Sequence, residues 1–383
     1  MNSKIWLSSP HMGGNERKFV TEAFDTNWVA PLGPNVNGFE KDLENSLGGG
    51  VHVAALSAGT AAIHLALILL DVKAGDEVIC QSMTFSASAN PIRYQHAKPV
   101  FIDSEKETWN MDPVFLKDAI KDRMAKGKKP KAIIPVHLYG MPARMQAIME
   151  IAEKYEIPIV EDAAEALGSS INNKKCGTFG EVGILSFNGN KIITTSGGGA
   201  IVSKNEHLVK QATFLATQAR DPAPHYQHSH IGYNYRMSNI CAGIGRGQME
   251  VLPERIQQRR ANFSFYQKEL KDMPGIHFVN EPSGFYSNRW LTTILVNPGE
   301  SGGITREDIR LALERENIES RPLWKPMHLQ PVFKEFPYYG EKVAETLFEN
   351  GLCLPSGSNL FQEDLERVVE SIKRVFTLYP VKE

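Results

Sequence analysis

Short apolar segments alternate with helical patterns through the first half of the chain. Hydrophobic residues recur with helical spacing at residues 60–70, 113–124 and 143–155. Aliphatic runs without polar alternation predict buried strands at residues 51–56, 77–80, 99–103, 132–137, 158–161, 183–187 and 200–202. Because strands that alternate with helices build βαβ units, this order predicts an α/β fold with a mostly parallel sheet that is covered on both faces.

The second half of the chain has a different pattern. A polar stretch at residues 219–230 ends the alternation, and a long helical pattern follows from residue 237 to residue 270. A predicted strand at residues 291–296 and predicted helices at residues 306–316 and 363–378 form a smaller α+β set. We therefore predict a large domain over residues 1–250 and a small C-terminal domain over residues 251–383.

Composition narrows the class of protein. The 383 residues include 42 basic and 44 acidic side chains, which leaves a net charge of −2. This balance argues against non-specific nucleic-acid binding and against a basic membrane-binding surface. The longest apolar stretch, residues 63–70, is far shorter than the roughly 18 residues that a membrane span needs, and the first residues lack the apolar core of a secretory signal. These features predict a cytoplasmic globular enzyme without nucleic-acid or membrane partners.

The cysteines and histidines lack metal-ligand spacing. The four cysteines, at positions 80, 176, 241 and 353, are far apart and form no CxxC pair, so we expect reduced thiols. Three histidines lie between residues 225 and 230, but no Asp, Glu or Cys stands at a suitable spacing beside them. We therefore predict no metal site.

Small and polar residues follow the first predicted strand, and ligands bind at such strand ends in parallel sheets. The sequence Ser57-Ala58-Gly59-Thr60 leads directly into a helical pattern. Small residues allow a ligand to approach the backbone, and the free N–H groups of a first helical turn can bind an anion. The alternative is an ordinary strand–turn–helix connection in which Thr60 is the N-cap.

Two carboxylates end the strand at residues 158–161. Glu161 and Asp162 come directly after its apolar run. A carboxylate in this place can hold a protonated ligand nitrogen by a charge-assisted hydrogen bond. The alternative is that Asp162 caps a following helix.

A lysine follows the strand at residues 183–187. Ser186 lies near the end of this strand, and Lys191 stands beside Ile192 and Ile193 after a polar turn. A lysine that is partly desolvated by apolar neighbours can lose its proton and form a Schiff base. The alternative is a solvated surface lysine. The glycines at residues 197–199 do not make the GxGxxG pattern of a dinucleotide-binding loop.

Two later segments also combine polar and aromatic residues. Residues 231–239 hold Asn, Tyr and Arg side chains just before the long helix, and the alternative interpretation is a plain helix N-terminus. Residues 321–328 combine cations, a Trp and two prolines. This second segment could hold an anionic or sugar ligand, or it could be a packed connection.

Taken in order, these segments resemble the sugar aminotransferases of the pyridoxal 5′-phosphate (PLP) fold-type-I class, the DegT/DnrJ/EryC1/StrS family. The resemblance covers nearly the whole chain and rests on residues 7–14, 27–34, 57–62, 161–165, 186–191, 232–236, 321–328 and 353–357. It implies the PLP-dependent transferase fold type I. In that fold a large domain with a mostly parallel mixed sheet is joined to a smaller C-terminal α+β domain.

The resemblance also implies roles for individual residues. Lys191 matches the Schiff-base lysine, and Asp162 matches the carboxylate that keeps the pyridine nitrogen protonated. Phe85 matches the aromatic side chain that stacks on the ring. Further cofactor contacts are implied for Gly59, Thr60 and Ser186 in a phosphate cup, for Asn234 from the neighbouring subunit, and for Glu165 and Asn188, whose positions other branches fill with Gln or His. Substrate contacts are implied for Tyr233, Arg321 and His328.

The closest branch that the chain resembles aminates C4 of a UDP-linked 4-keto-6-deoxy-N-acetylhexosamine in exopolysaccharide or glycan biosynthesis. This implies glutamate as the amino donor and a homodimer with shared active sites. One alternative is amination at C3, or of another nucleotide-linked keto sugar. Two others are a sugar dehydratase, in which a His replaces the lysine at position 191, and a non-catalytic scaffold of the same fold.

Overall fold

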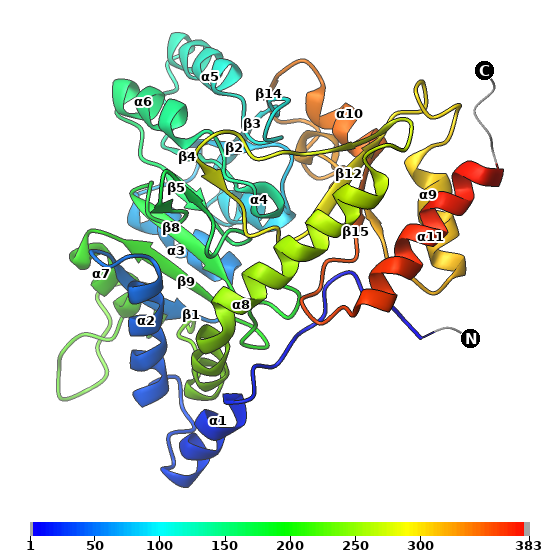
Figure 1. Cartoon of the computed structure of the whole chain (residues 1–383). Coiled ribbons are helices and arrows are strands. Elements are labelled where there is room, and N and C mark those ends of the chain that lie inside the picture. Colours follow the sequence, from blue (N-terminus) through cyan, green and yellow to red (C-terminus); the bar gives the residue numbers. More distant parts are fainter. Residues whose placement is uncertain (1–2, 379–383) are drawn as a thin grey trace.

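The computed structural model describes residues 3–378, and a twisted sheet lies at the centre of its larger part (Figure 1). Its strands form two ladders, β1-β9-β8-β5 and β14-β3-β2-β4, and single parallel bridges join the ends of β4 and β5. Strand β9 is antiparallel to both neighbours and every other pair is parallel, so the predicted mostly parallel mixed sheet is confirmed. The strands are β1 (His52–Leu56), β2 (Glu77–Gln81), β3 (Lys98–Ile102), β4 (Ala132–Ile134), β5 (Val160–Asp162), β8 (Val182–Ser186), β9 (Gly199–Ser203) and β14 (Tyr338–Tyr339).

Helices cover both faces of this sheet. Helices α3, α4 and α7 pack against side chains such as Leu56 and Cys80, whereas α2, α8, α5 and α6 pack against the opposite face, which presents Ala55 and Ile79. The sequence pattern does not predict α4, which contains Pro91. The helices of this part are α1 (Glu16–Asp25), α2 (Pro34–Ser46), α3 (Gly59–Leu69), α4 (Ser86–Tyr94), α5 (Pro113–Ala125), α6 (Met145–Tyr155), α7 (Glu206–Ala216) and the long α8 (Asn239–Leu270).

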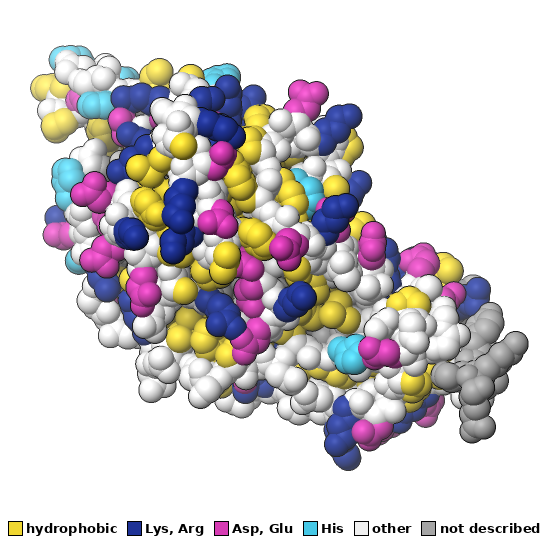
Figure 2. All heavy atoms as spheres, turned by 90° about the horizontal axis from the view of Figure 1, so that it is seen from above, with side chains coloured by type: hydrophobic (Ala, Val, Ile, Leu, Met, Phe, Trp, Pro, Cys, Tyr) yellow, Lys and Arg dark blue, Asp and Glu magenta, His cyan; other side chains and the backbone are white. Residues whose placement is uncertain are grey.

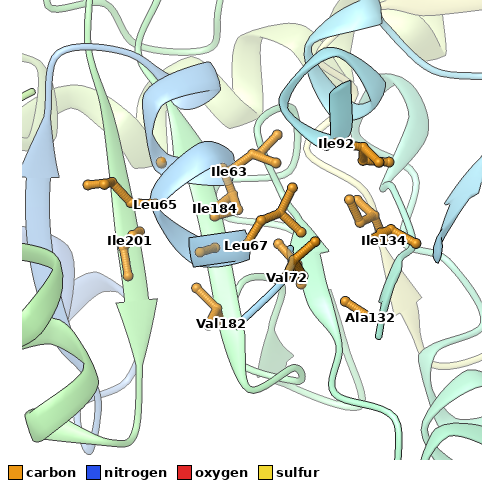
Figure 3. Close-up of a cluster of buried hydrophobic side chains, with 14 of the residues drawn as sticks. Ile63, Leu65, Leu67, Val72, Ile92, Ala132, Ile134, Val182, Ile184 and Ile201 are labelled. Carbon is orange, nitrogen blue, oxygen red and sulfur yellow. The ribbon is translucent and has the colours of Figure 1, made fainter. Parts of the chain in front are cut away.

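Helix α3 is apolar on nearly every side because it is enclosed by its neighbours. Figure 3 shows Leu65 of α3 beside Ile201 of β9, and Ile63 of the same helix beside Ile184 of β8. Each fully buried aliphatic side chain of this kind contributes roughly 1.5–3 kcal/mol relative to an exposed one. This packing fixes the N-terminus of α3 at the carboxyl ends of β1 and β8.

The C-terminal part is built on a second sheet, which is antiparallel throughout. Its strand order is β10-β12-β15-β13, and α9 and α11 pack beside it (Figure 1). The elements are β10 (Ile276–Phe278), β12 (Thr292–Val296), α9 (Arg306–Arg315), β13 (Arg321–Pro322), α10 (Val343–Asn350), β15 (Gly351–Leu354) and α11 (Gln362–Leu378). The predicted strand and both predicted helices of this part are therefore present.

The two parts are interleaved rather than separated at one point. The predicted boundary at residue 250 falls inside α8, which spans both parts. After it, β11 (Phe285–Tyr286) pairs with β6 (Ser170–Ile171), itself paired with β7 (Lys174–Lys175), and β14 pairs with β3. Near the other end of the chain, Ile5 forms a parallel bridge with Ile318.

Surface charge and helix hydropathy add two observations. Figure 2 shows Lys and Arg side chains intermixed with Asp and Glu across the face seen from above. Within residues 3–378, no helix is both long enough and apolar enough to cross a membrane.

Candidate active site

A cavity of about 400 Å³ opens at the carboxyl ends of the parallel strands. Its size lies in the range of small-molecule binding sites, roughly 300–1,000 Å³. Segments from both parts of the chain form its walls. The cavity brings together nine of the predicted site residues, which are Gly59, Thr60, Phe85, Asp162, Glu165, Ser186, Asn188, Lys191 and Arg321.

The N-terminus of α3 forms one end of the cavity. Ala58 is the N-cap residue, so the alternative in which Thr60 caps this helix is wrong. A Cβ atom on Gly199 would lie 2.3 Å from the Gly59 nitrogen, and one on Gly59 would lie 3.1 Å from Ser186 Cβ. These glycines bring the hydroxyl-bearing Thr60 and Ser186 together at a helix end whose N–H groups lack intrahelical partners and carry partial positive charge. The arrangement suits a phosphate.

Asp162 is a buried carboxylate at the end of β5. Its Oδ2 accepts a hydrogen bond from the Ser88 hydroxyl at 2.6 Å, and its Oδ1 accepts one from the Ala164 N–H at 3.1 Å. A turn, not a helix, follows β5, so the helix-capping alternative is wrong. The carboxylate is therefore held in one orientation at the cavity wall, where it can pair with a protonated ligand nitrogen.

Lys191 is not a solvated surface lysine. Its side chain is 12% exposed, and its Nζ lies 3.5 Å from Glu165 Oε1 and 4.1 Å from the centre of the Trp290 ring. The other oxygen of Glu165 accepts the Tyr139 N–H at 2.7 Å. Burial raises the pKa of Glu165 to about 7; Lys191 opposes this rise and the Asp162 carboxylate adds to it.

The remaining wall is aromatic and comes from both parts of the chain. Phe85, just before α4, is 55% exposed and faces the cavity, and its ring centre lies 5.6 Å from that of Trp324. Arg321 lies at the same cavity and pairs with Glu319 at 3.0 Å. Trp290 and Glu319, which also line the cavity, were not among the predicted site residues. The sequence has Trp290 just before the predicted strand at residues 291–296, but nothing in the sequence places that strand at the cavity.

Three predicted site residues lie outside the cavity of their own chain. Tyr233 packs with its ring centre 5.1 Å from that of His64, and Asn234 is exposed and bridges to Thr217. His328, a predicted substrate contact, also lies outside this cavity. Its Nδ1 lies 2.6 Å from Ser82 Oγ, and its ring stacks on a tyrosine, so it fastens the segment at residues 321–328 to the end of β2.

One group of buried side chains has the composition of a metal site. His137, Glu161 and Cys176 bring their ligand atoms within 4.8 Å of one another. Glu161 already accepts the His137 Nε2–H and three backbone N–H groups, and His137 Nδ1 accepts the Ala143 N–H. Because the Glu161 carboxylate and His137 Nδ1 already accept these hydrogen bonds, the cluster acts as a structural hydrogen-bond network. The three histidines between residues 225 and 230 are exposed and do not form such a group.

The residues of the cavity fit the predicted cofactor. The start of α3 with Thr60 and Ser186 suits the phosphate of PLP, Asp162 suits its pyridine nitrogen, and Lys191 offers an amine that can bond to it. The exposed ring of Phe85 is available to stack on the cofactor ring.

Comparisons with known proteins agree with this fit. The model of the DegT/DnrJ/EryC1/StrS aminotransferase family matches residues 10–373. EpsN of Bacillus subtilis strain 168, assigned as a PLP-dependent aminotransferase, is 51% identical over all of this chain and 98% of its own. The GDP-perosamine synthase of Caulobacter vibrioides is 36% identical over 97% of this chain and 98% of its own. The PLP form of Spr1654 from Streptococcus pneumoniae, assigned as a sugar aminotransferase, superposes with a TM-score of 0.89 at 27% identity over 99% of this chain and all of its own.

Proposed function

Since the chain belongs to the DegT/DnrJ/EryC1/StrS aminotransferase family and is a PLP-dependent aminotransferase, we propose that it aminates a nucleotide-linked keto sugar. The proposed reaction transfers the amino group of glutamate to C4 of a UDP-linked 4-keto-6-deoxy-N-acetylhexosamine. The observation that carries the proposal is the convergence of Lys191, Asp162 and the N-terminus of α3 on one cavity. The similarity to a synthase named for a GDP-linked sugar and to Spr1654, assigned as a sugar aminotransferase, supports a sugar substrate.

The residues of the cavity have complementary tasks in this proposal. PLP supplies an electron sink for the carbon that loses its proton. The start of α3 with Thr60 and Ser186 binds the phosphate, and Asp162 keeps the pyridine nitrogen protonated. Lys191 bonds to the cofactor and then, once released, moves the proton at the reacting carbon. Arg321, with a side chain 68% exposed at the cavity, is placed to meet an anionic group of a substrate.

The alternatives differ in what they require of these residues. A sugar dehydratase of this family would have His at position 191, where this chain has Lys191. A non-catalytic scaffold would not need the hydrogen bonds that orient Asp162. A GDP-linked keto sugar is the second candidate substrate, because one relative is a GDP-perosamine synthase.

We also propose a cytoplasmic homodimer in which each site is completed by the partner. Asn234 is exposed and lies outside the cavity of its own chain, which supports a role toward a phosphate held mainly by another copy. The predicted substrate contact of Tyr233 belongs to the same proposal, because Tyr233 directly precedes Asn234 in the sequence.

A half-reaction tests the substrate. The enzyme is loaded with pyridoxamine phosphate and mixed with UDP-, GDP- or dTDP-linked 4-keto and 3-keto sugars. We expect the UDP-linked 4-keto sugar to restore the absorbance of the PLP-loaded enzyme fastest. A faster response to a GDP-linked or 3-keto sugar would replace the proposed substrate, and no response to any of them would contradict a keto-sugar substrate.

Borohydride trapping tests Lys191 itself. Reduction should attach the cofactor irreversibly to Lys191 in the wild type, and Lys191→Ala should remain unlabelled and inactive while it still binds PLP through the phosphate cup and Asp162. Peptide mass spectrometry locates the label. Labelling of another lysine in Lys191→Ala would contradict the assignment.

A further inference from the structure

Two side chains, Trp290 and Glu165, enclose the amine of Lys191. The lysine needs neither of them in order to bond to the cofactor. Its Nζ is 4.1 Å from the centre of the Trp290 ring and 3.5 Å from Glu165 Oε1. Trp290 is 2% exposed, and the Lys191 side chain is 12% exposed. An indole face attracts a cation most strongly when water is excluded from the pair. Trp290 and Glu165 therefore take the place of water around the amine.

Trp290 is held in position from three directions. Its indole N–H donates to the Asn190 carbonyl at 2.7 Å, and its backbone N–H donates to Asn288 Oδ1 at 2.9 Å. Its carbonyl accepts a hydrogen bond from the buried Arg259 guanidinium at 2.6 Å. Because Asn190 precedes Lys191 in the chain, the indole N–H also fixes the backbone that carries the lysine.

Glu165 is oriented by the same surroundings. Asn288 Nδ2 donates to the Glu165 carbonyl at 2.8 Å, and the Tyr139 N–H donates to its Oε2 at 2.7 Å. Tyr139 has a φ of 53°, a left-handed conformation that a bulky side chain rarely adopts. Strain of this kind persists only where surrounding contacts impose it. The result is that Oε1 of Glu165 is left to face Lys191.

We propose that Trp290 is a positioning residue for Lys191 and that, with Glu165, it forms the resting place of the lysine ammonium whenever that nitrogen is not bonded to the cofactor. The proposal rests on the proposed function, in which Lys191 is the amine that bonds to PLP. A released lysine on a four-carbon side chain has many conformations, and proton transfer requires it to stay close to the reacting carbon. The indole face limits those conformations.

Two substitutions distinguish the effect of the aromatic face of Trp290 from the effect of its indole N–H hydrogen bond. Trp290→Leu removes the aromatic face, and Trp290→Phe keeps a face but loses the N–H bond to Asn190. We expect kcat to fall about tenfold or more in Trp290→Leu and clearly less in Trp290→Phe. KM for glutamate should change less than about threefold in both, because the face acts on the lysine and not on bound substrate.

Trp109→Leu is the matched control. Trp109 is 5% exposed, lies in the same hydrophobic cluster and does not line the cavity that holds Lys191. This variant should lose thermal stability while its kcat stays close to that of the wild type. If Trp109→Leu and Trp290→Leu lower kcat equally, or if Trp290→Phe is as slow as Trp290→Leu, the proposal is wrong.

Chemical labelling supplies a readout other than turnover. The holoenzyme is converted with glutamate, which leaves Lys191 free, then desalted and treated with acetic anhydride. Mass spectrometry should find Lys191 acetylated roughly five- to tenfold faster in Trp290→Leu than in the wild type or in Trp109→Leu. Equal rates would overturn the proposal. If the wild type is not trapped at Lys191 by borohydride, the proposed role of the lysine fails instead, so the two failures are distinguishable.

Discussion

At the scale of single residues, two carboxylates three positions apart meet the cavity in different surroundings. Asp162 accepts hydrogen bonds from a hydroxyl and a backbone N–H, which stabilise its charge. Glu165 accepts one backbone N–H and faces the amine of Lys191, and burial raises its pKa to about 7. Asp162 is therefore held in one orientation by its hydrogen bonds, whereas Glu165 is suited to change its charge near neutral pH.

Asp162→Asn tests the first of these carboxylates. The amide keeps the size of the side chain but cannot hold a proton on the pyridine nitrogen, so we expect PLP to remain bound and the rate of the glutamate half-reaction to fall by roughly 10²–10³. Single-turnover absorbance measures this rate. Ser88→Ala, which removes one hydrogen bond but keeps the charge, should lower it much less. An Asp162→Asn rate within a few-fold of the wild type would exclude the role.

Glu165→Gln tests the raised pKa. A Glu carboxyl in an unfolded chain has a pKa of about 4.3, so the folded protein binds this proton more tightly. The wild type therefore loses stability through this group as the pH rises from about 5 to 8. The amide does not titrate, so the Tm of Glu165→Gln relative to the wild type should rise between pH 5 and pH 8. A Tm difference that is the same at both pH values would contradict the shift.

At the scale of elements, the site depends on how closely β9 approaches the start of α3. Gly199, the first residue of β9, leaves no room for a side chain against the backbone of Ala58 and Gly59. This contact keeps the first turn of α3 beside Ser186 at the end of β8. The geometry of the proposed phosphate cup thus follows from the antiparallel strand that interrupts an otherwise parallel sheet.

Gly199→Ala tests this contact. The added carbon would lie 2.3 Å from the Gly59 nitrogen, and backbone atoms cannot move aside cheaply. We expect a loss of about 1–3 kcal/mol in the free energy of unfolding, together with weaker PLP binding. Gly197→Ala is the control, because its added carbon would lie 3.9 Å from the nearest atom, Ser57 O. Denaturant unfolding and PLP titration of both variants measure the difference, and equal stability of the two would contradict the argument.

The sequence alone predicts those elements that depend on a local pattern of residues. The strand ends at Asp162 and Ser186 and the helix start at Gly59 follow from apolar runs and small residues, and each lies within one residue of its predicted position. The contribution of Trp290 could not be predicted, because it depends on a C-terminal strand folding back across the cavity. His328 illustrates the same limit, since its motif is local but its partners, Ser82 and Glu345, are distant in sequence.

At the scale of the whole molecule, the cavity is assembled from segments that are far apart in the chain. Ser57 and Lys191 come from the larger part, whereas Trp290, Glu319 and Arg321 come from the C-terminal part. Asn234 lies outside this cavity, on a segment that runs beside the end of β1. The arrangement is consistent with the proposed contribution of Asn234 to a second copy of the chain.

Mixing two inactive variants tests the shared site. Asn234→Ala should bind PLP weakly, because losing a hydrogen bond to a charged group costs about 1.5–3 kcal/mol, and Lys191→Ala should be inactive at any PLP concentration. When equal amounts are unfolded together and refolded at limiting PLP, about half of the dimers are mixed and hold one intact site, so roughly a quarter of all sites should recover. Activity no greater than the average of the two variants would exclude the shared site.

The pairing of the first residues with a late strand also has a consequence for synthesis on the ribosome. Ile5 bridges to Ile318, and the Leu7 N–H donates to Glu319, a residue 312 positions later that lines the cavity. At roughly 5–20 residues per second, the ribosome needs about 15–60 s to supply this partner. The beginning of the nascent chain therefore lacks its native partner until translation is almost complete, and a prematurely terminated chain cannot close this side of the cavity.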